Sequence, residues 1–215
     1  MRVRRAITLL VSAVCFCATS AQASTISGRL WAVPDAIAGN AVPANVPVVA
    51  PNVTFDVDAP LNFTVPGTVQ QFLLSGGAFN IVPQTAGDLT RLLSNGVIST
   101  LIEFTGFVTV TTGQQFTVTH DDGLTLIIGA TNLGFGPGPT APIQSLATYN
   151  GPSGTFPFQL VYGECCAGAA VLQIGLPLQA TPNGSTVPEP ATLALFGTGA
   201  LGLVTRLRRR RQHTL

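Results

Sequence analysis

The chain of 215 residues contains no lysine, one methionine, one tryptophan and only 9% charged residues. Its ten basic residues are all arginines, and eight of them lie near the two ends. Between Ser24 and Val187, Arg29 and Arg91 stand against eight carboxylates, so this interior carries a net charge of −6. An acidic, lysine-free body excludes nucleic acid as a partner, because that binding depends on neutralising phosphates. It is compatible with cations and with uncharged ligands such as sugars.

The sequence also lacks the patterns that mark common enzymes. It shows no Ser/His/Asp set with supporting motifs, no Cys/His pair near an activating element and no His-x-x-x-His metal pair. Glu103 with Glu164 or Asp122 offers carboxylates for acid–base catalysis, but their spacing does not indicate a hydrolase. We therefore expect a protein that is not an enzyme.

The first 23 residues have the pattern of a secretory signal peptide. Three arginines at positions 2, 4 and 5 precede an apolar run over residues 6–16, and Ala21-Gln22-Ala23 forms a cleavage signal. After cleavage only Cys165 and Cys166 remain, and an exported protein favours oxidised cysteines. Because the two are adjacent, three states stay open: a vicinal disulfide, pairing between chains, and free thiols.

The last 29 residues, from Val187 on, have the pattern of a membrane-sorting tail. A polar linker over 178–186 is followed by a helix-breaking motif, an apolar segment at 191–205 and a basic cluster. As a helix the apolar segment would be roughly 22 Å long, short of the ~30 Å hydrocarbon core of a bilayer. It would therefore be a marginal permanent anchor. The residues that carry this pattern are Val187, Pro188, Glu189 and Pro190, with Arg208, Arg209, Arg210 and Arg211.

This tail, over 187–211, closely resembles the PEP-CTERM sorting signal of Gram-negative bacteria. The resemblance implies recognition by an exosortase, removal of a briefly membrane-held helix, and export to the cell envelope, the cell surface or an extracellular matrix such as a biofilm. A plain C-terminal membrane anchor is the alternative.

Residues 24–177 form the secreted domain, and their pattern predicts antiparallel β structure. Short β-branched and aromatic runs are separated by Gly, Pro, Asn and Thr, and alternation assigns Val53, Phe55 and Val57 to an inner face. Two such faces give a β-sandwich or flattened barrel. One short helix is expected at 88–93, and long loops at 34–51 and 129–150. The expected strands are 25–33, 52–58, 78–82, 99–110, 115–120, 124–128, 156–162 and 169–175.

The sequence His120-Asp121-Asp122-Gly123 predicts a tight turn between two of these strands. Neighbouring side chains of an extended chain point to opposite faces, so Asp121 and Asp122 can share an ion only if their peptide is cis or the turn is very tight. Oxygen ligands alone would favour Ca²⁺ over zinc. The alternative is a structural turn in which the carboxylates cap backbone amides. His120 is expected to be a packing or hydrogen-bonding residue rather than a ligand.

The stretches 104–129 and 154–172 resemble the PA14-like module, a β-sandwich of microbial adhesins, toxins and glycosidase appendages. Where members bind sugars, the resemblance implies that Asp121 and Asp122 ligate Ca²⁺ and that a second loop contacts the glycan. Here that loop contains Gly163, Glu164, Cys165 and Cys166 in place of the Asn of sugar-binding members.

We therefore expect an exported, non-catalytic binding or adhesion module whose ligand is a polysaccharide. A structural matrix protein without a specific ligand is the alternative. Trp31 and Tyr149 could be sugar-stacking platforms, although a lone tryptophan in a strand usually belongs to the core.

Overall fold

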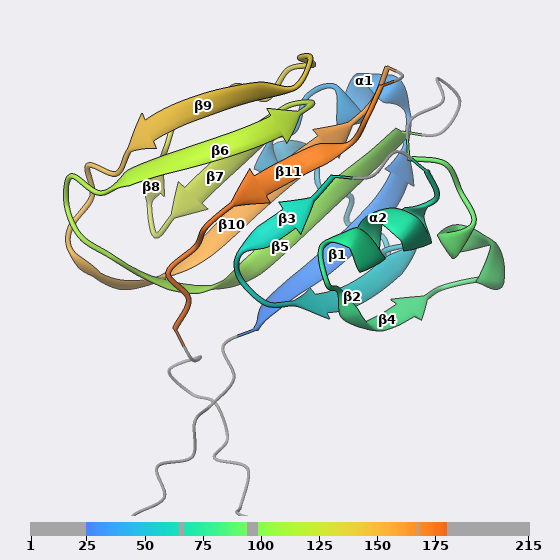
Figure 1. The fold of residues 1–215 in the computed structure, drawn as a ribbon, viewed down its shortest axis with the longest axis horizontal. Helices are drawn as coiled ribbons and strands as arrows, with labels where there is room; N and C mark the ends of the chain where they lie inside the picture. The colour runs from blue at the N-terminus through green and yellow to red at the C-terminus, as the bar shows by residue number, and fades with distance from the viewer. Residues whose placement is uncertain (1–24, 65–66, 94–98, 167, 180–215) are drawn as a thin grey trace, which may run out of the picture. The chain divides into compact units, whose positions relative to one another are not determined.

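Alternating apolar and polar residues build two antiparallel sheets that face each other (Figure 1). The computed structural model describes residues 25–64, 67–93, 99–166 and 168–179. In spatial order, the larger sheet contains β4 (Phe79–Pro83), β2 (Val53–Val57), β1 (Ile26–Val33), β5 (Ser99–Val110), β10 (Gly154–Glu164), β7 (Leu124–Ile128) and β8 (Thr131–Asn132). The smaller sheet contains β3 (Leu61–Phe63), β11 (Val171–Ile174), β6 (Gln115–Asp121) and β9 (Ile143–Thr148).

Short helices complete the fold. Helix α2 (Val69–Ser75) starts with a capping box between Thr68 and Gln71, and its buried side packs beside β3. Helix α1 (Asp35–Ala38) and the 3₁₀ turn η1 (Pro43–Asn45) belong to the 34–51 segment, and a second 3₁₀ turn, η2 (Ala86–Leu89), follows β4. Among the residues that the structure describes, no helix is long and apolar enough to cross a membrane.

The core between the sheets is built from the inward residues of both layers. The ring of Phe63 on β3 stacks on Phe72 of α2 at 4.9 Å, and Phe72 in turn stacks on Tyr162 of β10 at 6.3 Å. On β2, Val53, Phe55 and Val57 are all buried, as their alternation predicts. Helix α2 is therefore held by aromatic contacts that reach both sheets.

All eight predicted strands are confirmed, and the all-β sandwich with them. The strands expected at 99–110 and 124–128 have the observed bounds of β5 and β7, and six others differ only at their ends. The helix expected at 88–93 is wrong: the chain forms the 3₁₀ turn η2 instead. The Asp88 carboxylate accepts the backbone amide of Thr85 at 2.8 Å, and the turn ends at Thr90.

The expected structureless loop at 129–150 is also wrong, because it contains β8 and β9. Strand β9 pairs with β6 along its whole length, but its inward positions include the small residues Ser145 and Ala147. It therefore lacks the apolar alternation that marks a strand in sequence. The signal peptide, the linker from residue 180 on, the sorting motif and the apolar segment at 191–205 lie outside the described residues.

The two ends of the described chain meet at the same part of the domain. The amide of Gln179 donates to the carbonyl oxygen of Phe107 at 2.9 Å, and the carbonyl oxygen of Thr25 lies 3.5 Å from where a Cβ on Gly106 would stand. At the other end of β5, Thr100 pairs with Glu164. The loops that follow β6 and β10 thus lie at the end of the sandwich away from Thr25 and Gln179 (Figure 1).

Candidate functional site

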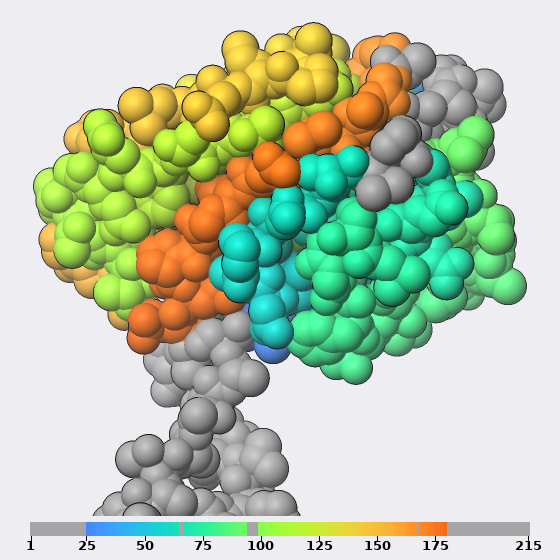
Figure 2. All heavy atoms as spheres, in the orientation of Figure 1, coloured from blue at the N-terminus to red at the C-terminus, as the bar shows by residue number. Residues whose placement is uncertain are grey.

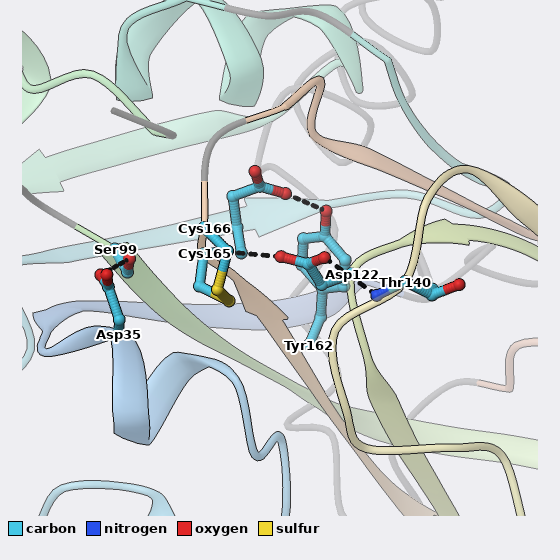
Figure 3. Close-up of a disulfide and its surroundings, with 8 residues drawn as sticks. Asp35, Ser99, Asp122, Thr140, Tyr162, Cys165 and Cys166 are labelled. Atoms are coloured by element: carbon cyan, nitrogen blue, oxygen red, sulfur yellow. Dashed lines mark hydrogen bonds between the residues drawn. A yellow bond between two sulfur atoms is a disulfide. The ribbon is translucent and has the colours of Figure 1, made fainter. Parts of the chain in front are cut away.

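The Asp121–Asp122 turn joins β6 to β7 at this far end of the sandwich. Both side chains are buried, with exposed fractions of 6% and 4%, and the peptide bond between them is cis. Three segments come together around them: the loop after β10, the loop between β8 and β9, and the α1 segment. Figure 3 shows the first two of these segments in contact with Asp122.

Asp122 is the hub of this arrangement. Its Oδ2 accepts the backbone amide of Cys165 at 2.7 Å, and its Oδ1 accepts the backbone amide of Thr140 at 3.1 Å. Hydrogen bonds to a carboxylate are stronger than those between neutral groups, so one side chain holds two loops in place. This capping of backbone amides is what the structural-turn alternative expects of Asp122.

His120 fixes the turn from the other side. Its Nδ1 lies 2.5 Å from the carbonyl oxygen of Asp122 and its Nε2 lies 2.9 Å from the hydroxyl of Ser145. A carbonyl oxygen can only accept, so Nδ1 carries the proton, and in the neutral ring Nε2 accepts from Ser145. His120 is 3% exposed, which agrees with its expected role as a hydrogen-bonding residue at a strand end.

Two glycines allow the loops to come this close. A Cβ placed on Gly123 would lie 2.1 Å from the carbonyl oxygen of Pro137, and one on Gly163 would lie 1.9 Å from that of Ala38. Both distances are far below van der Waals contact. A side chain at Gly123 would therefore displace the loop at Pro137, and one at Gly163, on β10, would displace the end of helix α1.

Burial raises the pKa of the Asp121 carboxyl to about 6, and the charge of Asp122 and a hydrogen bond with it act in the same direction. Oδ2 of Asp121 lies 3.7 Å from where a Cβ on Gly168 would stand, so the Asp121 carboxyl faces the loop after β10. Two adjacent carboxylates with little water around them repel each other, and a proton or a cation relieves that repulsion.

Beneath the turn, Tyr162 connects β10 to β6 and β11. Its hydroxyl contacts the carbonyl oxygen of Asp121, lies 2.9 Å from Oε2 of Glu164 and accepts the amide of Val171 at 3.2 Å. Burial, followed by the charge of Glu164 and a hydrogen bond with it, raises the pKa of Tyr162 well above 10. The phenol therefore stays protonated and works as a structural clamp.

The four residues of the second loop that were predicted to contact a ligand differ in their exposure to solvent. Cys166 is exposed, whereas Gly163, Glu164 and Cys165 are buried. Glu164 is only 1% exposed and points to Tyr162, so it belongs to the support of the turn. The sulfur atoms of Cys165 and Cys166 are bonded to each other, which is one of the three states left open by the sequence (Figure 3).

Two residues of the site, Thr140 and Tyr162, are not predicted by the sequence. Thr140 acts through its backbone amide, which carries no side-chain signature, and Tyr162 reads as an ordinary inward residue of a strand. Trp31 and Tyr149 are 2% and 1% exposed, so both are core residues and neither offers a stacking surface.

The fold of the domain is similar to that of known structures. The chain is similar to a PA14 sugar-binding domain from an RTX adhesin, with a TM-score of 0.52 and 20% identity over 74% of this chain and 92% of that one. That match shows that the domain has the PA14 fold, as the sequence resemblance predicts.

Two further similar structures are less alike. A PA14 domain of the MpAFP antifreeze protein has a TM-score of 0.48 and 17% identity over 74% of this chain and 84% of its own. Epithelial adhesin 9 A domain from Candida glabrata, solved with Galb1-4GlcNAc, has a TM-score of 0.41 and 8% identity over 78% of this chain and 94% of its own.

The C-terminal tail matches a known sorting motif. Residues 186–210 match the PEP-CTERM protein-sorting motif, which confirms the prediction made from Val187 to Arg211. The chain thus combines a PA14-fold domain with a PEP-CTERM sorting motif. No curated protein matches it.

Proposed function

We propose that this chain is an exported, surface-associated protein whose domain is a non-catalytic adhesion module. It binds the hydroxyl groups of a glycan through a Ca²⁺ ion held by Asp121 and Asp122. The observation that carries the proposal is the pair of adjacent, buried carboxylates at the end of the sandwich away from Thr25 and Gln179. The PA14 fold, shared with a domain named for sugar binding, supports the same reading.

The electrostatics of the turn favour a hard cation. Burial already drives Asp121 towards its protonated form, so a divalent ion at this position would compete with a proton and remove the repulsion from Asp122. Each oxygen of Asp122 accepts one amide and keeps a further lone pair. Oxygen-only ligands fit Ca²⁺ better than the nitrogen- and sulfur-binding metals.

An incomplete set of protein ligands leaves room for a sugar. Calcium takes about 6–8 oxygen ligands. In the described part of the chain, no cluster of three or more His, Cys, Asp or Glu side chains could hold a metal ion. Backbone carbonyls and the hydroxyls of a bound glycan would therefore complete the coordination shell, and the exposed Cys166 would lie beside that glycan.

A second candidate function follows from the same hydrogen bonds. Because Asp122 caps the amides of Thr140 and Cys165, the turn can be explained without an ion. The protein would then be a structural component of the extracellular matrix without a specific ligand.

Calorimetry and a glycan array distinguish the two functions. The proposal expects Ca²⁺ binding and glycan hits that disappear in EDTA and in Asp121→Asn. That variant keeps the size of the side chain and removes its charge. The matched control is Asp58→Asn, which removes one charge from an exposed carboxylate at the end of β2 and should bind as the native protein does. No heat of Ca²⁺ binding, or glycan hits unchanged in Asp121→Asn, would reject the calcium-dependent function.

The sorting motif implies processing by an exosortase on the way to the cell surface. Replacing Pro188 and Glu189 with alanine should leave the C-terminal arginines on the protein and retain it in the membrane fraction. Mass measurement of the C-terminus in the native host, beside the unaltered chain, tests this. Identical termini and identical localisation would count against processing at this motif.

A further inference from the structure

The outer face of the smaller sheet carries a row of neutral hydrogen-bonding side chains. Gln173 of β11 pairs in register with Asn62 of β3 on one side and with Thr119 of β6 on the other, and Thr119 pairs with Gln144 of β9. These side chains therefore stand in one line across all four strands of this sheet. With strands about 4.8 Å apart, the line is roughly 14 Å long.

The row is also organised as a binding surface. Gln173 Nε2 donates to Asn62 Oδ1 at 2.9 Å, which orients both amides and leaves their remaining donors and acceptors available. Asn62 and Gln144 are exposed, and Gln173 and Thr119 are half-buried. In Figure 2 strands β9, β6, β11 and β3 lie side by side on the face turned towards the viewer.

A shallow groove of about 280 Å³ runs along this row. Its walls combine amides and hydroxyls with small apolar surfaces, and none of its lining residues is ionisable. In a secreted body with a net charge of −6, this is a neutral area. The lining residues are Pro60, Leu61, Asn62, Thr117, Thr119, Gln144, Gln173, Ile174 and Gly175.

We propose that this groove binds a segment of a neutral polysaccharide. Amide groups can donate to and accept from neighbouring hydroxyls at once, and the groove offers them in a line, as a linear ligand requires. Pro60 and the exposed Leu146, which lies opposite Thr117, supply apolar surface for the carbon-bound hydrogens of a sugar ring. A charged polymer would have to bury its charge against groups that cannot neutralise it.

The groove adds to the Asp121–Asp122 turn and works without a cation. Thr119 and Asp121 lie two residues apart on β6, so the groove begins about 7 Å along the strand from the turn. The inference rests on the proposed carbohydrate function for the class of ligand. The two sites can be tested separately, because the groove contains no carboxylate.

Affinity electrophoresis in EDTA tests the groove alone. The native protein should migrate more slowly through native gels that contain hydroxyethyl cellulose, dextran or pullulan than through polymer-free gels. It should not be slowed by carboxymethyl cellulose, the charged counterpart of the first probe. The double variant Gln144→Glu/Gln173→Glu keeps side-chain shape and adds charge to the groove, so its apparent affinity should fall at least about tenfold.

Gln115→Glu is the control for added charge, because it adds one negative charge to an exposed position of β6 outside the groove, and it should bind as the native protein does. Thr119→Val removes one hydroxyl at nearly constant volume, and it should also weaken binding. It tests the groove if the double variant fails to fold. The proposal is wrong if none of the three neutral polymers slows the native protein. It is also wrong if the folded groove variants bind as tightly as Gln115→Glu.

Discussion

The backbone amide of Cys165 donates a 2.7 Å hydrogen bond to Oδ2 of Asp122, 43 residues earlier in the chain. The other oxygen of the same carboxylate accepts from Thr140, in a different loop. The turn after β6 and the disulfide-containing loop after β10 are therefore one structural unit. A change in either segment should alter the structure of the other.

Replacing Asp122 with asparagine should destabilise the domain. The amide NH₂ cannot accept, so one of the two backbone amides loses its partner in a buried place. We expect a loss of about 1–3 kcal/mol in the free energy of unfolding, measured by urea denaturation in EDTA. Asp58→Asn, at an exposed position, should change it little. A fully stable Asp122→Asn would contradict the hub role of this carboxylate.

The stability of the metal-free domain should fall as the pH rises from 4 to 7. In the folded state the pKa of Asp121 is about 6, above its usual value of 3.8, so folding favours the protonated form. This contribution is complete below pH 3.8 and is lost as the pH passes through about 6. It amounts to at most about 3 kcal/mol.

Thermal melting in EDTA at several pH values measures this effect as the difference between the native protein and Asp121→Asn. That difference cancels the titration of other groups. Asp121→Asn should gain stability relative to the native protein towards pH 7, and a difference that does not vary with pH would refute the shifted pKa.

Gly123→Ala should disrupt the packing of the turn, because its Cβ would overlap the backbone at Pro137. A loss of roughly 1–3 kcal/mol or more is expected from such overpacking. Gly136→Ala is the matched control: it lies in the same contacting loop, and a Cβ there meets nothing within 4 Å. Guanidinium denaturation of both variants provides the comparison, and equal stability would show that the loops separate at little cost.

Periodicity alone was enough to predict much of the sheet structure. Strand β2 shows this well, since Val53, Phe55 and Val57 alternate with polar residues and all three are buried. Strand β9 could not be predicted, because an edge strand with one open face can hold small and polar residues at nearly every position.

The candidate site was predictable only in part. The paired aspartates stand out in the sequence, but the groups that contact them are backbone amides 18 and 43 residues away. Such contacts depend on how closely the loops approach, which Gly123 and Gly163 permit. The sequence does not show which backbone segment will pack against a given glycine.

The shared position of Thr25 and Gln179 at one end of β5 has a consequence for how the domain would be displayed. From Phe107 to Thr100, beside Glu164, the strand covers about 24 Å. Gln179, from which the chain continues, and the Asp121–Asp122 turn therefore lie at opposite ends of the domain. The neutral groove lies on the outer face of the smaller sheet, so a long polymer bound there would follow the side of the domain.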